Sequence, residues 1–292
     1  MDVKNGDLVA EADCGGEIGD ARPFATHRKI EPGHLISPFT AAVVLDSGVA
    51  ASVESHFSSD RREPSFAEFR LPSDGNDDKA EMSVSNALVK SSNVVMSKIG
   101  ILCGAEKLYD GFAKLGLSSS LKRPERWGRQ ERTRISIGQG VRMTALDLAR
   151  AYAILANNGC STNGEQVVSA ATAASILSAL EDVIQSGTGC KAAIYHVRIA
   201  GKTSTSDRMS NDGCYESGKY ISAFASIFPA EKPKYAMVVW FETARNEKEP
   251  GLHYGGGRAA LASREIIKRI INSGRLRMTA SRMCMCGENT AT

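Results

Sequence analysis

The sequence lacks any run of about 18 or more consecutive apolar residues, the length that a transmembrane helix requires. Its N-terminal region also lacks the apolar centre of a signal peptide, because charges recur there at Asp2, Lys4, Asp7 and Glu11. We therefore predict no membrane anchor in this chain, which as written would stay in the cytoplasm where it is made.

An excess of charge of one sign is missing as well. A net charge of +3 over 292 residues is too small to indicate a nucleic acid or an anionic membrane as a partner. The 7 cysteines are odd in number and scattered, which favours reduced thiols over a disulfide framework. Only Cys284 and Cys286 stand at a metal-ligand spacing, and a mobile tail is a simpler interpretation of them than a soft-metal site. We expect no metal and no cofactor.

What the sequence does contain is an almost uncharged segment, Leu35–Leu45, with apolar side chains on every face. This pattern predicts a helix buried on all sides that begins after Pro32 and Gly33. The unpaired N–H groups and the dipole of a first helical turn favour developing negative charge. His34 and Ser37, at i and i+3, would project from that turn on one side, so they are candidate catalytic residues.

The segment Glu31–Thr40 reads EPGHLISPFT and resembles the active-site entry of the penicillin-binding transpeptidases. In that family a Glu-Pro-Gly turn leads into the motif S-x-x-K, whose serine is acylated and whose lysine handles the proton of that serine. Here His34 occupies the serine position and Ser37 the lysine position. The surrounding sequence therefore marks the place of the active site, while its two reactive groups are replaced.

A second match is Ser91–Asn93, which resembles the S-x-N motif of the same family. The resemblance implies that Ser91 faces the nucleophile and passes protons, and that Asn93 holds the substrate amide. A Ser-Ser-Asn sequence is also common at helix caps, so the tripeptide gains weight only from its longer context, LVKSSNVVMSKIG.

A third match lies in Val197–Ser206, which begins as a strand and resembles the family motif A-G-K-T-G-T. The resemblance implies that Lys202 places positive charge at the substrate carboxylate and that Thr203 adds its hydroxyl. Ser204 stands where the family has glycine, and a glycine on an active-site strand lets a ligand backbone lie close. We expect Ser204 to narrow the groove, and Thr203, Ser204 and Thr205 are candidate substrate-binding residues.

The most diagnostic length of chain is Ile135–Gly159. Thr144 and Asp147 form a variant of the capping box, and apolar residues at helical spacing follow until an Asn-Asn-Gly sequence ends the helix. The segment resembles the family pattern S-I-G-Q-G followed by T-x-L-x-L-A-x-A-Y-A-x-L-A-N-x-G, in which Gly138 and Gly140 would fit a tight backbone passage. A helix packed only for structure would fit this motif equally well, so it identifies the family without testing activity.

The rest of the pattern predicts the other elements. Asn5-Gly6 indicates a hairpin turn beside an early strand, and the charge-dense stretch 122–134 indicates a solvated loop rather than a patch for an acidic partner. Loops are expected at 13–30 and, with at most short strands, at 52–80. Helices are expected at 82–88, at 101–117 with Leu102 on the apolar face, at 167–185, and after Ala260 with Ile266 and Ile267 facing inward. Strands are expected at 197–206, 219–229 and 235–242.

The resemblance covers residues 2 to about 272, with its motifs in the family order. It implies an α+β fold of the β-lactamase/transpeptidase type, in which an antiparallel sheet is flanked by helices and joined by an all-helical lobe. We predict one penicillin-binding transpeptidase domain over residues 1–274 and an irregular tail over 275–292. The subgroup resembled is the monofunctional class B, division or elongation type, whose members are membrane-anchored and face the periplasm.

For function, the resemblance implies a D,D-transpeptidase of peptidoglycan cross-linking, with a stem peptide or a β-lactam as ligand and other cell-wall synthesis proteins as partners. Because His34 and Ser37 replace the serine and the lysine, we expect acyl transfer to be impaired or lost. One alternative is an active enzyme that uses Ser37 as nucleophile with His34 and Lys202; a simpler interpretation of the pair is that His34 caps the helix and Ser37 fills space. Another alternative is a non-catalytic remnant or scaffold.

Overall fold

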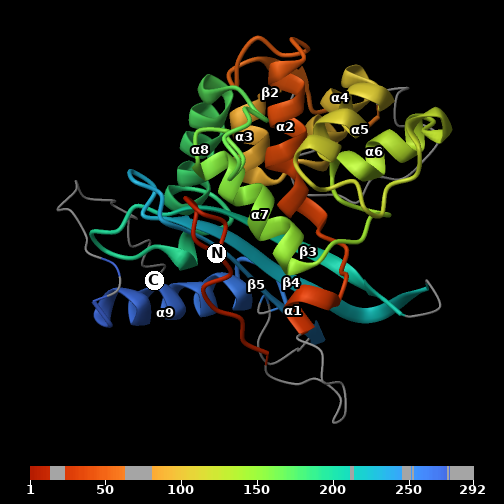
Figure 1. Cartoon of the computed structure of the whole chain (residues 1–292). Helices are drawn as coiled ribbons and strands as arrows, with labels where there is room; N and C mark the ends of the chain where they lie inside the picture. Colours follow the sequence, from red (N-terminus) through yellow and green to blue (C-terminus); the bar gives the residue numbers. More distant parts are fainter. Residues whose placement is uncertain are drawn as a thin grey trace, which may run out of the picture.

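The computed structural model describes residues 1–13, 24–62, 81–210, 214–244, 251, 253–274 and 276. An antiparallel sheet of order β3-β4-β5 crosses the molecule, with most helices on one face and α9 on the other (Figure 1). The strands are β1 (His56–Ser58), β2 (Glu81–Ser83), β3 (Ala200–Met209), β4 (Tyr215–Phe228) and β5 (Tyr235–Ala244). This arrangement confirms the predicted α+β class with its flanked antiparallel sheet and helical lobe.

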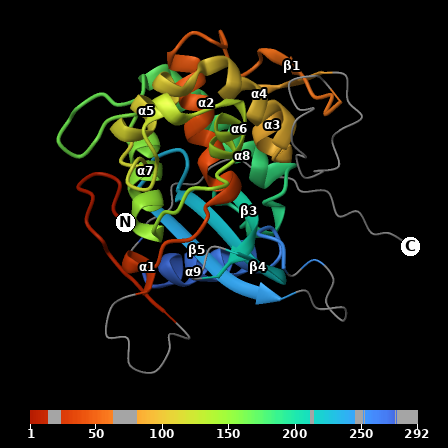
Figure 2. The same cartoon turned by 90° about the vertical axis from the view of Figure 1, so that its right-hand side faces the viewer.

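The helices follow the hydrophobic pattern of the sequence. They are α1 (Phe24–His27), η1 (Gly33–Ile36), α2 (Ser37–Asp46), α3 (Val84–Lys90), α4 (Asn93–Cys103), α5 (Ala105–Lys114), η3 (Pro124–Arg126), α6 (Arg129–Ser136), α7 (Ala145–Ala156), α8 (Ala170–Gln185), η4 (Cys190–Ala192) and α9 (Arg258–Asn272). In Figure 2, turned by 90°, α2 again runs down from the helical lobe towards β3. Among the described residues, none of these helices combines the length and the apolar character that crossing a bilayer would need.

The central sheet separates two apolar cores, because alternate residues of a strand point to opposite faces. Along β4, Ile221, Ala223 and Ala225 join the large core that the helical lobe fills, whereas Phe224 and Phe228 join the smaller core beneath α9. β4 therefore has no solvent-facing side over this stretch, in keeping with its central place in the sheet.

The central helix α2 is buried as its composition predicts. Leu35, Phe39 and Val44 have no exposed surface. The Tyr152 hydroxyl of α7 donates to the Leu35 carbonyl at 2.9 Å, and its ring meets Phe39 edge-on at 4.9 Å between centroids. α7 itself begins with the predicted capping box of Thr144 and Asp147. These contacts lock the start of α2 against α7.

Several boundaries differ from prediction. The turn that carries His34 is a 3-10 helix, η1, and α2 begins only at Ser37. The helix predicted at 101–117 is divided by Gly104, whose φ of 87° ends α4, and Leu102 is 55% exposed rather than buried. Ile266, predicted to face inward on α9, is 39% exposed, while Ile267 is fully buried.

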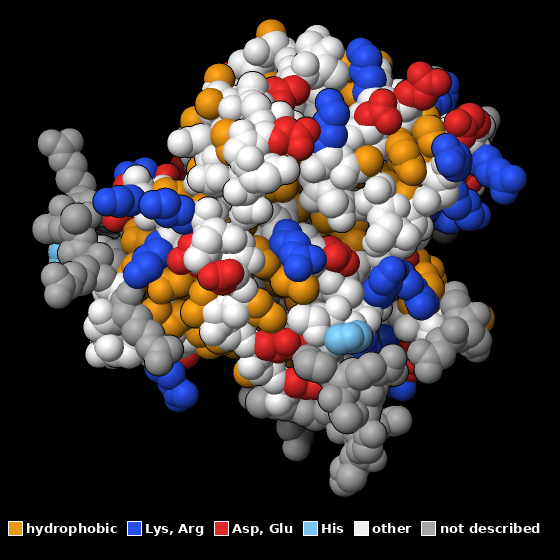
Figure 3. Space-filling model, in the orientation of Figure 1, with side chains coloured by type: hydrophobic (Ala, Val, Ile, Leu, Met, Phe, Trp, Pro, Cys, Tyr) orange, Lys and Arg blue, Asp and Glu red, His pale blue; other side chains and the backbone are white. Residues whose placement is uncertain are grey.

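The charged stretch 122–134 is not the loop that its composition suggested. It contains η3 and most of α6, and Trp127 between them is only 6% exposed. In Figure 3, Lys and Arg side chains alternate with Asp and Glu over the upper right, where α5 and α6 lie in Figure 1. Charges of both signs on this face agree with the prediction of a solvated surface.

At the N-terminus, residues 3–5 form a turn, and Asp2 makes a single antiparallel bridge to Tyr235 in place of the expected strand. The short strands β1 and β2 pair with each other, with Phe57 opposite Met82. The predicted tail, 275–292, and with it Cys284 and Cys286, lies outside the described residues apart from Leu276.

Two glycines of the predicted backbone passage differ in their surroundings, which gives a stability prediction. Gly138 and Gly140 have φ of 74° and 72°, but a Cβ on Gly138 would lie 2.1 Å from the Gly33 carbonyl oxygen, whereas one on Gly140 would meet nothing within 4 Å. We expect Gly140→Ala to lose about 1 kcal/mol of unfolding free energy from the left-handed backbone alone. Gly138→Ala should lose about 2–5 kcal/mol because the clash adds to that strain. Urea unfolding of both variants measures the difference, and equal losses would contradict the close approach of 138 to 33.

Candidate active site

The imidazole of His34 lies between two polar side chains. Its Nδ1 is 2.7 Å from Ser37 Oγ, one turn further along the chain, and its Nε2 is 2.9 Å from Asn93 Oδ1 at the start of α4. Since Asn93 Oδ1 can only accept, Nε2 carries the proton in the neutral ring, and Nδ1 accepts the Ser37 hydroxyl proton. Both ring nitrogens are therefore already satisfied by the protein.

Ser37 sits one turn deeper than His34. Its side chain has no exposed surface, and Pro38 and Phe39 after it are buried as well. A nucleophile needs a path for its carbonyl substrate, so this burial counts against Ser37 as the acylated residue.

Lys202 lies on β3 and reaches towards the junction of α3 and α4. Its Nζ donates to Ser91 Oγ and, at 3.2 Å, to the Thr203 carbonyl. Lys202 has no exposed surface, whereas Ser91 is half-buried and adopts a left-handed backbone, with φ of 56°. Ser92 supplies the N-cap bond to Val95 N, so the Ser91 hydroxyl is left to the lysine.

These two pairs form one cluster. Ser91, which contacts Lys202, and Asn93, which contacts His34, stand two residues apart in the same turn, so the two hydrogen-bonded pairs meet there. The charge of Lys202 also acts on His34. The structure thus brings together His34, Ser37, Ser91, Asn93 and Lys202, the candidate catalytic residues of the sequence analysis.

Burial sets the protonation of both bases. The pKa of His34 falls from 6.5 to about 3, mainly because of burial and also because of the positive charge of Lys202, while the hydrogen bond of Asn93 acts in the opposite direction. Burial also lowers the pKa of Lys202 from 10.5 to about 7. At neutral pH His34 is uncharged and a large share of Lys202 is a neutral amine.

The candidate substrate-binding residues alternate along β3. Thr203 Oγ1 is 2.5 Å from Thr188 Oγ1, and Thr205 Oγ1 accepts from the Gly255 N–H at 2.9 Å. Ser204 points the other way: a Cβ on Gly33 would lie 2.2 Å from its Oγ, so this hydroxyl fills the space beside η1.

The Ser204 hydroxyl has another feature. It is buried and, among the described residues, finds no hydrogen-bond partner. A buried hydroxyl without a partner costs roughly 1–3 kcal/mol, so the residue at this position is retained at a cost in stability.

Sequence reasoning missed the residues that hold the turn in place. The Glu31 carboxylate is 5% exposed; it accepts from Gly140 N at 2.8 Å and from the Tyr215 hydroxyl at 3.0 and 3.1 Å. The Ser206 hydroxyl donates to the Glu31 carbonyl at 3.1 Å. Burial raises the pKa of Glu31, and burial together with the Glu31 charge raises the pKa of Tyr215 to about 12. Only the EPG match could have pointed to Glu31.

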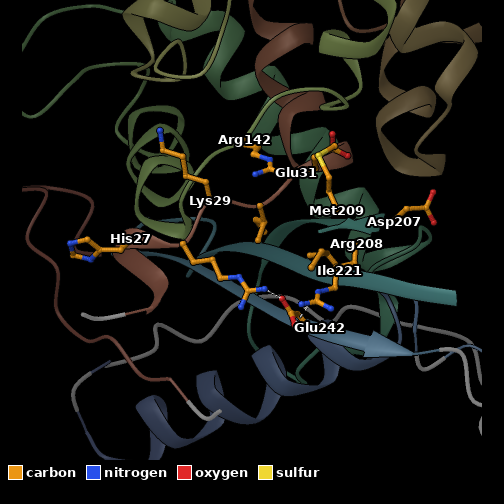
Figure 4. A pocket seen from close by; sticks show the side chains of 11 residues that line it. His27, Lys29, Glu31, Arg142, Asp207, Arg208, Met209, Ile221 and Glu242 are labelled. Atoms are coloured by element: carbon orange, nitrogen blue, oxygen red, sulfur yellow. Dashed lines mark hydrogen bonds and ion pairs between the residues drawn. The ribbon is translucent and has the colours of Figure 1, made fainter. Parts of the chain in front are cut away.

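Glu31 also borders a polar cavity of about 250 Å³ at the far end of β3. Figure 4 shows Arg208 and Glu242 meeting on its floor, while Glu31 and Arg142 lie on the opposite side. Arg208 Nε is 3.2 Å from Glu242, which also pairs with Arg28. The cavity charges thus largely neutralise one another. Across the described ranges, no group of three or more His, Cys, Asp or Glu could hold a metal ion.

The two lowered pKa values predict how stability depends on pH. Between about 3 and 6.5 the unfolded chain takes up a proton at His34 that the folded chain does not, so unfolding free energy should fall as pH drops, by up to about 1.4 kcal/mol per pH unit. Between about 7 and 10.5 the unfolded chain retains the Lys202 proton that the folded chain loses, so stability should rise with pH.

Substitutions test which residue causes the pH dependence of stability in each of these two pH ranges. His34→Gln should flatten the acid limb and Lys202→Met the alkaline limb in urea titrations, whereas His56→Gln, at an exposed position of β1, should change neither. Limbs that persist in these variants would show that other groups cause them.

Comparisons of the sequence with known proteins identify the family of this chain. The family model for the penicillin-binding protein transpeptidase domain matches residues 1–270. Peptidoglycan D,D-transpeptidase FtsI of Escherichia coli K12 is 28% identical over 89% of this chain and 48% of its own length. Probable peptidoglycan D,D-transpeptidase PenA of Neisseria flavescens is 26% identical over 83% of this chain and 64% of its own. The chain thus spans about half to two thirds of these relatives.

Solved structures agree on the fold. The transpeptidase domain of penicillin-binding protein 3 from Burkholderia pseudomallei has a TM-score of 0.78 at 22% identity and covers 96% of this chain and 88% of its own. Penicillin-binding protein 3 from Mycobacterium tuberculosis, solved with aztreonam, has a TM-score of 0.79 at 23% identity, over 96% and 72%. FtsI and PenA are therefore relatives of this chain, and the match over residues 1–270 shows that the chain belongs to the penicillin-binding protein transpeptidase domain family.

Proposed function

We propose that this chain binds the peptidoglycan stem peptide in the manner of its family but is impaired in, or has lost, acyl transfer from the start of the central helix. The observation that carries the proposal is the His34 imidazole, which is held by Ser37 and Asn93. The resemblance of the segment 31–40 to the family motif assigns His34 to the position of the nucleophile. An imidazole occupied at both nitrogens has no free lone pair with which to attack a carbonyl.

The expected loss of activity is large. Removing the nucleophile of a serine hydrolase lowers turnover on the order of a million-fold. Binding depends on other groups: Lys202, Asn93 and the threonines of β3 remain in place. The proposal therefore separates recognition, which is retained, from chemistry at the helix start, which is not.

A competing function has one observation in its favour. The 2.7 Å contact between His34 Nδ1 and Ser37 Oγ is the geometry of a histidine that activates a serine. Two observations oppose it. Ser37 has no exposed surface, and His34 is a weak base because its pKa is low. The competing function requires an acyl adduct on Ser37.

A remnant without any selected function predicts a different outcome. A sequence that drifts should accumulate core errors of 1–3 kcal/mol each, on the order given for typical destabilising substitutions. Instead, residues from α2, α3, α4, α7 and α8 fill the large core with many side chains of no exposed surface. The density of this core supports a chain that unfolds cooperatively.

Binding tests the proposal directly. We expect calorimetric titration with a synthetic peptidoglycan stem peptide to show saturable binding by the parent chain. At pH 6, where Lys202 carries its proton, Lys202→Met should weaken binding by about tenfold or more, because it removes a charge-assisted bond to the peptide carboxylate. Lys268→Met, on α9 across the sheet, is the control and should bind as the parent does. Absence of binding by a cooperatively folded parent chain would refute the proposal.

A labelled penicillin followed by denaturing mass spectrometry tests the chemical half. We expect no adduct on the tryptic peptide 30–61, which contains His34 and Ser37. An adduct on Ser37 within that peptide would establish the competing function and overturn this one.

A further inference from the structure

The lysine of this site has an unusual partner. Lys202 Nζ is fully buried, and its hydrogen bonds go to the Ser91 hydroxyl and to the Thr203 carbonyl, both uncharged. Within the described ranges, no carboxylate forms an ion pair with this amine. A buried ammonium without a counter-ion is costly, so the site favours the neutral amine, which can accept a proton.

Ser91 differs from the other hydroxyls of the cluster in its access. Ser37 and Ser92 have no exposed surface and Ser204 is 4% exposed, but Ser91 is half-buried at the turn between α3 and α4. Its left-handed backbone lifts it out of the helical ladder, and the N-cap role falls to Ser92. Ser91 thus combines a contact with a base and a surface that a substrate can reach.

Nucleophilic serines need an adjacent base, and a buried lysine serves this purpose in serine-lysine pairs. The second base of the cluster cannot compete for this role, since His34 is held by Ser37 and Asn93. Ser91 is therefore the partly exposed hydroxyl of the cluster, and it is in contact with the buried amine of Lys202.

We propose that Ser91 is the residual acyl acceptor of this chain, with Lys202 as its general base and with activated amides or esters as its acyl donors. Ser91 Oγ attacks the carbonyl carbon while its proton moves to the neutral Nζ of Lys202. The tetrahedral intermediate then collapses, the bond from carbon to the leaving nitrogen or oxygen breaks, and the proton on Nζ passes to the leaving group. The product is an ester on Ser91 and a neutral Lys202.

If the stem peptide is the natural acyl donor, that part of the proposal rests on the proposed function, but the chemistry of Ser91 does not. A fluorophosphonate tests the chemistry alone, because it reacts with activated serines by displacing fluoride and needs no peptide recognition. Failure of stem-peptide binding and failure of Ser91 labelling are therefore separate results.

The experiment locates the adduct by tryptic mass spectrometry. Trypsin releases residues 91–98, SSNVVMSK, separately from 30–61, so an adduct on Ser91 and one on Ser37 appear on different peptides. We expect the fluorophosphonate adduct on Ser91. No adduct on this peptide, or an adduct on Ser37, would overturn the proposal.

Three variants sharpen the assignment. Ser91→Gly suits the left-handed backbone and should fold while losing the label. Ser97→Ala removes a fully buried hydroxyl from the same tryptic peptide and should label as the parent does. Lys202→Met should slow labelling by about 100-fold or more, the usual contribution of a general base. Undiminished labelling of Ser91→Gly or of Lys202→Met would refute the assignment.

The pH profile distinguishes a base from a structural lysine. The labelling rate should rise with pH through about 7, where Lys202 loses its proton. The charge of Lys202 acts on His34 of η1, and with a pKa of about 3 this imidazole stays neutral over the range. A rate independent of pH between 5.5 and 8.5, a window of roughly 1.5 units on either side of that pKa, would overturn the role of Lys202.

Discussion

The close approach of two backbone segments governs this site. Gly33 N donates to the Gly138 carbonyl at 3.1 Å, and the Gly33 carbonyl leaves no room for a side chain at 138. η1 lies between this passage and Ser204 of β3, and the side chain that follows Gly33 reaches Asn93 at the start of α4. The Glu31 carboxylate fastens the other end of the turn through Gly140 N. These contacts fix the backbone from which the side chain of residue 34 projects.

The fold does not depend on the identity of the side chain at position 34. Contacts of Tyr152 on α7 with Leu35 and Phe39 stabilise the start of the central helix, and none of these contacts involves position 34. The imidazole is accommodated by polar neighbours on both sides. These two contacts hold His34 without involving the packing of α2 against α7.

The sequence predicted the fold well because the fold depends on hydrophobic period, caps and glycines that are visible locally. The capping box at Thr144 and the buried α2 were found in this way. It failed where tertiary contacts override local pattern: Gly104 divides the helix predicted at 101–117, and packing around Trp127 orders the charged stretch. No local signal in the residues around Tyr215 indicates that it reaches Glu31, since 184 residues separate them.

The candidate site could be listed from sequence but not its internal pairing. Motif matches gave His34, Ser91, Asn93 and Lys202 as a set, yet which hydrogen bond joins which pair depends on distances set by four separate elements. Thr188, the partner of Thr203, lies in a loop that no motif marks. The matches therefore supplied the participants, and only the three-dimensional packing supplied their partners and protonation.

Electrostatics favours a neutral residue at position 37 beside His34. A lysine at position 37 would place a second buried ammonium in the cluster that already holds Lys202, with no described carboxylate paired to either amine. With Ser37 in its place, the cluster holds a single amine, and burial alone brings its pKa to about 7. The neutral hydroxyl of Ser37 also donates a hydrogen bond to His34 Nδ1. A lysine ammonium could donate to the same nitrogen, but burying its charge beside this imidazole would cost solvation energy. If His34 and Ser37 replace the serine and the lysine of the family motif, as we propose, the two replacements are coupled, because each residue satisfies a polar atom of the other.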